Sequence, residues 1–143
     1  MNLRNLLTNI GEMAKAQKLI NYSAAGTSLD QLNPINIDWY PVLFQSPTGS
    51  HLVQENYTTY EITLYYLDRL LEDYHNDIDI FSSAIENLKN IIIGIKALPG
   101  VIDIPFDYVI RNFTETERMN DSIAGAYATI KVKAVNDDLC FEE

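Results

Sequence analysis

Four side chains in one short charged stretch have the residue types of an acid–base or metal site: Asp68, Glu72, Asp73 and His75. Carboxylates and an imidazole within one or two helical turns can converge on a substrate or a metal ion. The alternative is a solvated loop between a strand and a helix, where acidic residues also favour the helix N-terminus. We expect the solvated loop and assign no catalytic residue, metal ligand or cofactor. A small hydrolase using Asp68, Glu72 or His75 is a further hypothesis.

Two other patterns for nucleophilic chemistry are incomplete. The stretch from Ser46 to His51 places hydroxyl groups near a histidine, but it lacks a strand-to-helix elbow and an orienting acid, which favours a hairpin loop. Cys140 is the single cysteine, and the acidic residues around it disfavour its thiolate form. No phosphate-binding Gly-Lys-Ser/Thr motif is present. The sequence therefore predicts a protein that is not an enzyme.

The charge composition of the chain excludes two classes of binding partner, DNA and anionic membranes. The 143 residues carry 20 acidic and 10 basic side chains, which gives a net charge of −10. Binding to DNA phosphates or to an anionic membrane requires clustered Lys and Arg, so neither function is expected. The sequence has no apolar run long enough to span a bilayer and no signal-peptide pattern, which predicts a protein made and kept in a cytoplasm.

Hydrophobic periodicity predicts a single domain over residues 1–143. Its expected parts are an N-terminal helix (1–20), a strand pair (39–67), a long helix (77–98), a second strand pair (106–135) and an acidic tail (136–143). Helices at these positions can bury their apolar faces on one side of a small sheet. The prediction is an α+β fold in which an antiparallel sheet of about four strands is covered by helices on one face, as a two-layer sandwich.

The faces of two elements can also be predicted. The apolar face of the long helix is expected to consist of Ile78, Phe81, Ile85, Leu88, Ile92 and Ile95. The last strand alternates strictly, and small residues dominate one of its faces: Ala124, Ala126, Ala128, Ile130, Val132 and Ala134. An alanine-rich face lets a helix approach the sheet closely.

Aromatic residues gather on the first strand pair. Ordinary packing across the sheet is one explanation for them. The other is contact between subunits, because Tyr and Trp bury a large area at low entropic cost and are enriched at interface cores. The interface candidates in and near the predicted strands are Trp39, Tyr40, Tyr57, Tyr60, Tyr65 and Arg111.

Two stretches resemble a known family. The segment Phe113 to Tyr127, F-T-E-T-E-R-M-N-D-S-I-A-G-A-Y, and the segment Leu64 to Arg69, L-Y-Y-L-D-R, are similar to parts of small neck and tail proteins in phages of gut Bacteroidales. The order of elements over residues 1–135 resembles the tail-terminator, or tail-completion, family of tailed bacteriophages. Its α+β subunits form a ring in the neck between the head connector and the tail.

The resemblance implies a structural virion protein without catalysis. Its partners would be other copies of itself in a ring, six-fold or else twelve-fold, the adjacent head-connector and tail proteins, and passing DNA that it does not bind specifically. The net negative charge agrees with a DNA conduit, because like charge repels the phosphates. Within residues 114–125, Arg118, Asn120 and Asp121 are the expected assembly contacts. A simple hairpin turn at Asn120-Asp121 explains the same residues equally well.

A second class of function is also consistent with these features. It is a small acidic adaptor module that binds a protein partner as a monomer or dimer and has no enzymatic activity. The two hypotheses differ in symmetry, because a ring subunit needs two different faces that meet head to tail. For the ring subunit, the expected location is the virion neck or tail, and the host cytoplasm during assembly.

Overall fold

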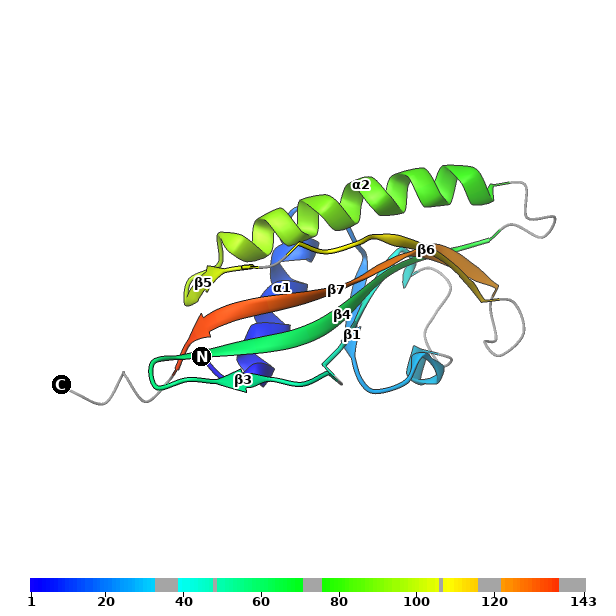
Figure 1. Cartoon of the computed structure of the whole chain (residues 1–143). Coiled ribbons are helices and arrows are strands. Elements are labelled where there is room, and N and C mark those ends of the chain that lie inside the picture. Colours follow the sequence, from blue (N-terminus) through cyan, green and yellow to red (C-terminus); the bar gives the residue numbers. More distant parts are fainter. Residues whose placement is uncertain (33–38, 48, 71–75, 106, 116–121, 137–143) are drawn as a thin grey trace.

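The computed structural model places a strongly curved sheet at the centre of the chain, with two helices packed on it (Figure 1). It describes residues 1–32, 39–47, 49–70, 76–105, 107–115 and 122–136. The described strands form one sheet of seven strands, with the main order β1-β2-β4-β7-β5. Strand β3 also pairs with β4, and β6 pairs with β7.

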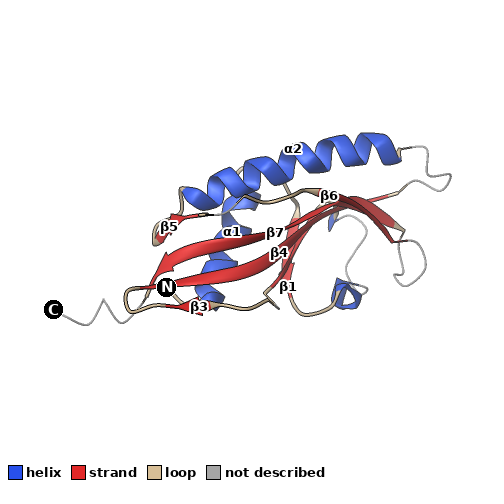
Figure 2. Cartoon of the chain, in the orientation of Figure 1, coloured by secondary structure: helices blue, strands red, loops and turns tan. Residues whose placement is uncertain are grey.

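Two long strands form the middle of the sheet. Strand β4 (Tyr57–Arg69) and strand β7 (Ile123–Val135) are antiparallel over their full lengths, from the pair Tyr57–Val135 to the pair Arg69–Ile123. Both are rich in β-branched or aromatic residues, which fit a pleated, half-buried surface. One face of each strand is buried under the helices, whereas Thr129 and Lys131 on the other face of β7 are exposed. Figure 2 shows that these two strands carry the curvature of the sheet.

Short strands flank this pair on both sides. Strands β2 (Val42–Ser46) and β3 (Leu52–Val53) pair with β4, while β5 (Val101–Asp103) and β6 (Arg111–Glu115) pair with β7. Strand β1 (Tyr22–Ala25) lies beyond β2 and runs parallel to it. The described sheet therefore ends at β1 on one side and at β5 and β6 on the other.

The expected antiparallel sheet of about four strands is wrong, although a mixed α and β composition is compatible with the structure. The β1–β2 pair is parallel, and β1, β3 and β5 contain only 4, 2 and 3 residues. Strands this short show no clear alternation, so hydrophobic periodicity cannot detect them. The third predicted strand, placed from residue 106, begins at Arg111.

Helices α1 (Leu3–Ala16) and α2 (Asp77–Lys96) share one hydrophobic core on one face of the sheet. In Figure 1, helix α2 runs along the β4–β7 pair, and helix α1 crosses behind these two strands. The core includes Leu6, Ile10, Ala14, Ile62, Leu64, Tyr66, Ala84, Leu88, Ile91, Ile92, Ile95, Ala126, Ala128, Ile130 and Val132. The small alanine side chains of β7 let α2 lie close to the sheet.

The buried face of α2 differs from the predicted face at its N-terminal end. Ile78 is 70% exposed, whereas Ile80 is 6% exposed and packs with Leu70 and Ala124. The spacings 78-81-85 and 80-84-88 both fit a helical stripe, so the pattern alone does not choose between them. Because the helix lies over the alanine face of β7, the stripe 80-84-88 is the one that is buried.

On the opposite face of the sheet lies a smaller core to which no α-helix of the described residues contributes. Its buried members are Tyr40, Val42, Phe44, Leu67 and Ile123. Leu29, from the short 3₁₀ helix η1 (Leu29–Leu32), packs against this cluster. The curved sheet and the segment after β1 thus cover the apolar residues that the α-helices do not reach.

Candidate functional site

Of the four candidates for an acid–base or metal cluster, only Asp68 lies within the described residues. Asp68 lies on β4, and its carboxylate accepts a hydrogen bond from its neighbour, the backbone N–H of Arg69, at 2.8 Å. Burial raises the pKa of Asp68, and this hydrogen bond partly opposes the increase. Glu72, Asp73 and His75 lie outside the described residues. In the part of the chain that is described, no group of three or more His, Cys, Asp or Glu side chains is arranged to hold a metal ion.

The histidine of the Ser46 to His51 stretch stabilises a turn. The Nδ1 atom of His51 accepts a hydrogen bond from the backbone N–H of Glu61 at 3.1 Å, and its ring meets the edge of Tyr60 at 5.5 Å. The Glu61 carboxylate accepts from the backbone N–H of Ser50 at 3.0 Å. These contacts hold the connection after β2 against β4. Because Nδ1 accepts this hydrogen bond, the neutral ring carries its proton on Nε2, so the atom that acts as base in a serine triad cannot take a proton from a hydroxyl.

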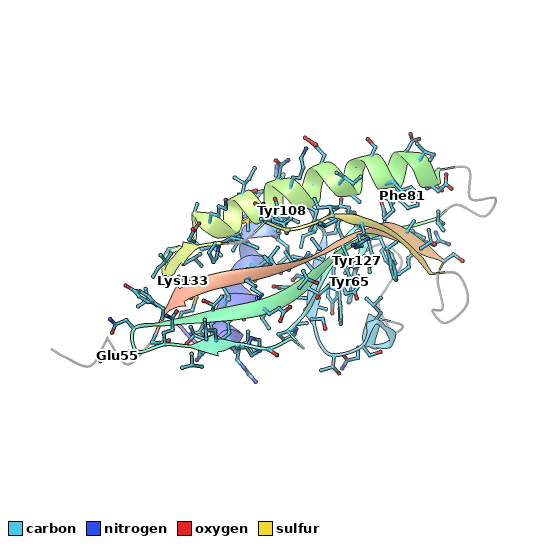
Figure 3. All side chains as sticks on the ribbon, in the orientation of Figure 1. Glu55, Tyr65, Phe81, Tyr108, Tyr127 and Lys133 are labelled. Atoms are coloured by element: carbon cyan, nitrogen blue, oxygen red, sulfur yellow. The ribbon has the colours of Figure 1, made fainter. Side chains whose placement is uncertain are left out.

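An aromatic cluster is centred on Tyr65, on the face opposite the helices. Its ring stacks on Tyr127 with centroids 5.4 Å apart, and Figure 3 shows these two side chains together. The Phe113 ring meets both of them edge-on. Phe44 completes the cluster at 6.3 Å from Tyr65. Burial raises the pKa of Tyr65, and its interaction with Tyr127 adds to the increase. The cluster fastens β2, β4, β6 and β7 together, so the main contacts of Tyr65 are within the chain.

The other predicted aromatic candidates on β4 also have partners in the same chain. The Tyr57 ring lies under Nζ of Lys133 at 4.6 Å, a cation–π contact. The Tyr60 hydroxyl donates to the carbonyl of Met1 at 3.2 Å. Both side chains are half-buried, so they leave only part of their surface for another molecule.

Trp39 and Tyr40 are adjacent in sequence but differ in exposure. Tyr40 is buried in the second core, whereas Trp39 stacks on Tyr22 at 4.6 Å and remains 42% exposed. Arg111 is exposed on β6. Arg118, Asn120 and Asp121 lie outside the described residues. Of the described candidates, Trp39 and Arg111 are therefore the most accessible.

The sequence analysis missed a groove of about 500 Å³ between α1 and β1. One flank of α1 and the adjoining strand residues line it: Leu3, Arg4, Leu7, Thr8, Gly11, Glu12, Lys15, Ser23, Ala24, Ala25 and Gln45. The α1 residues recur every three or four positions, beside the stripe that faces the core. In the sequence, the only indication of this groove is the position of Leu3 and Leu7 beside the core stripe. The position of β1 is needed to show that these two side chains line a groove.

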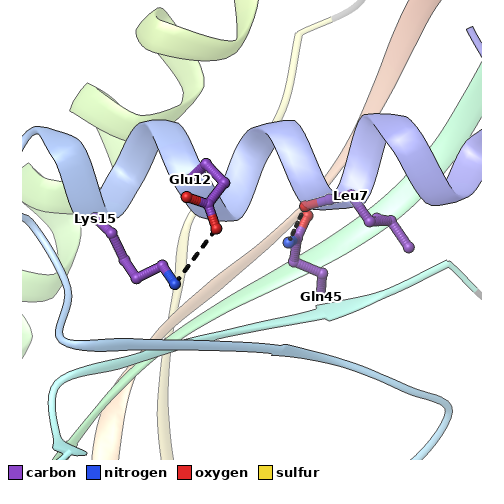
Figure 4. Close-up of polar contacts among 4 residues, drawn as sticks. All are labelled: Leu7, Glu12, Lys15 and Gln45. Atoms are coloured by element: carbon purple, nitrogen blue, oxygen red, sulfur yellow. Dashed lines mark hydrogen bonds and ion pairs between the residues drawn. The ribbon is translucent and has the colours of Figure 1, made fainter.

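Polar contacts fix the walls of this groove (Figure 4). The Nε2 atom of Gln45 donates to the carbonyl of Leu7 at 2.8 Å, and Lys15 pairs with Glu12 at 3.5 Å. The Oε1 atom of Gln45 is buried and accepts no hydrogen bond from the described residues. A Cβ atom on Gly11 would lie 2.5 Å from Oγ of Ser23, so glycine permits the close approach of α1 to β1.

The opposite margin of the sheet presents an extended segment between β5 and β6. Exposure alternates there, with Asp107, Val109 and Arg111 outward and Tyr108 and Ile110 packed against the main core. Val109 is 62% exposed. This margin and the α1 groove therefore lie on opposite sides of the β4–β7 pair.

Comparison with known proteins identifies no relative: neither a protein-family model nor a curated protein sequence matches the chain. None of the helices in the described ranges has the length and apolar character needed to cross a bilayer.

Proposed function

We propose that this protein is a structural subunit of a homo-oligomeric ring in a phage neck or tail, where it joins the head connector to the tail and surrounds the path of the DNA. One observation carries the proposal: the described sheet ends in two chemically different margins on opposite sides of the subunit. Strand β1 and the α1 groove form one margin, and β5, β6 and the segment between them form the other.

Two different margins on one subunit are what a head-to-tail contact requires. Such a contact repeats from copy to copy and closes into a ring when the rotation between copies divides a full turn. Unpaired strand edges and exposed apolar residues are otherwise a risk of uncontrolled association. In a ring, each margin would be covered by the next subunit, and the risk is removed.

The charge of the chain supports a position beside DNA. A net charge of −10 disfavours binding to phosphates, so DNA would pass without being held. The similarity of the segments Leu64–Arg69 and Phe113–Tyr127 to phage neck and tail proteins points to the same role. Head-connector and tail proteins would bind above and below the ring.

Purified protein provides the test. Mass photometry and negative-stain class averages across a range of protein concentrations are expected to show closed rings, with six-fold symmetry favoured over twelve-fold. A gel-shift assay with double-stranded DNA at low salt is expected to show no complex. A chain that stays monomeric, or that forms only a two-fold dimer, at every concentration would overturn the ring and support the adaptor hypothesis.

A further inference from the structure

The groove-lining flank of α1 presents charges of both signs in a fixed order. Arg4 lies near the start of the helix, Leu7 and Thr8 follow about one turn later, and Glu12 comes one turn after those. At about 1.5 Å of rise per residue, Arg4 and Glu12 are about 12 Å apart along the helix axis. The flank therefore reads positive, uncharged, negative from Arg4 to Glu12, and Lys15, which pairs with Glu12, adds a positive charge at the far end.

The segment leading into β6 presents the complementary order. Its outward residues are Asp107, Val109 and Arg111, which read negative, apolar, positive. In an extended chain that rises about 3.3 Å per residue, Asp107 and Arg111 are about 13 Å apart. The two charge spacings thus agree to about 1 Å.

Among the described residues, neither surface offers partners for most of these charges. Arg4, Asp107 and Arg111 take part in no ion pair with the described residues, and Glu12 has only an exposed pair with Lys15. Val109 is a largely exposed apolar side chain on an otherwise polar margin. Leu3 and Leu7 are the apolar side chains of α1 that line the groove, and Leu7 also packs against the main core.

We propose that the α1–β1 groove binds the 107–111 segment of a second copy of this chain, with Arg4 against Asp107, Leu7 and Thr8 against Val109, and Glu12 against Arg111. The inference rests on the proposed ring function and specifies its subunit contact. Since the two surfaces lie on opposite sides of the sheet, each copy offers one of each. The contact is therefore heterologous and can repeat around a ring.

Disulfide cross-linking tests this contact directly. In a Cys140→Ser background, which removes the single native cysteine, Thr8→Cys is combined with Val109→Cys. Mild oxidation of the assembled protein is expected to give a ladder of covalent oligomers that ends at the ring size. The matched control combines Val53→Cys, on exposed strand β3, with Val109→Cys, and it is expected to give no ladder.

Charge reversal tests the pairing. Arg4→Asp and Asp107→Arg, each alone, are expected to raise the protein concentration needed for assembly at least about tenfold, because like charges then face each other. The double variant Arg4→Asp with Asp107→Arg is expected to return to within about threefold of the wild-type value, since the pair is restored with opposite polarity. Both residues are exposed, and a thermal melt checks that each variant folds.

The outcomes separate this inference from the proposed function. Rings that form without a Thr8→Cys to Val109→Cys cross-link, or that tolerate both charge reversals, overturn the groove contact and leave the ring function in place. Failure of the wild-type chain to assemble at any concentration overturns both. Cross-linking together with rescue by the double charge reversal supports both.

Discussion

The Nε2 atom of Gln45 donates a hydrogen bond to the carbonyl of Leu7 at 2.8 Å, which ties strand β2 to the flank of helix α1. The bond crosses the floor of the groove and joins two elements that are far apart in the chain. Only the Nε2 end of the Gln45 amide is paired in this way. The Oε1 atom is buried and has no hydrogen-bond partner among the described residues. Position 45 therefore combines a favourable bond with the cost of an unsatisfied acceptor.

Gln45→Met is expected to change the free energy of unfolding by less than about 1 kcal/mol. Methionine keeps the side-chain volume, the Leu7 carbonyl retains its helical partner, and the unsatisfied acceptor is removed together with the bond. Urea denaturation followed by circular dichroism measures the change. Gln45→Ala, which leaves a cavity, is the control and is expected to cost more. A loss above about 2 kcal/mol in Gln45→Met would show that the amide is fully satisfied in the protein.

Gly125→Ala is expected to destabilise the protein by about 2–4 kcal/mol. A Cβ atom at this position would overlap the backbone carbonyl oxygen of Tyr66, and backbone cannot move aside without disturbing the β4–β7 ladder. The matched control is Gly49→Ala, where the added atom would meet the flexible side chain of Glu61. Thermal unfolding of the two variants compares them. Equal melting temperatures would contradict the predicted clash.

Tyr65 and Tyr127 are expected to be energetically coupled by about 0.5–1.5 kcal/mol. Their stacked rings lie directly opposite each other on β4 and β7. A double-mutant cycle with Tyr65→Leu and Tyr127→Leu, analysed by chemical denaturation, isolates this term. Because Phe113 contacts both rings, a second cycle in a Phe113→Leu background is the control. Strictly additive losses would show that the stacking contributes nothing beyond area burial.

Asp68→Asn is expected to stabilise the protein near pH 7. Burial raises the pKa of Asp68 in the folded state above its unfolded value of about 3.9, so folding favours the protonated form. The wild type therefore loses stability as the pH rises through the folded pKa, and the asparagine variant does not. The stability difference is expected to grow as the pH rises from the unfolded pKa of about 3.9 through the raised folded pKa, and urea titrations from about pH 3.5 to pH 7 measure it. Exposed Glu55→Gln is the control for net charge, and an equal gain there would contradict the explanation by burial.

The sequence by itself determined the long elements. Helix α2 begins at Asp77, as its pattern predicts, and the alternation of residues 122–135 identifies the strand whose alanine face receives the helices. These elements are long enough for their apolar period to repeat several times, so local pattern and final burial agree. The absence of phosphate-binding and nucleophile motifs, and the net charge of −10, are likewise properties of the sequence alone.

Only the tertiary structure decided how the sheet ends and which surfaces those ends present. Strands β1, β3 and β5 form because neighbouring strands offer them hydrogen-bonding partners. Nothing in sequences of so few residues requires a strand. The groove beside α1 exists because Gly11 lets the helix approach Ser23, a contact between residues on separate elements. Arg4 and Arg111 are far apart along the chain. Helix α1 packs against β1 at one margin of the sheet, and β6 pairs with β7 at the other, so the two residues lie on opposite margins. Long-range strand pairing, rather than local periodicity, sets which surfaces one subunit can offer to the next.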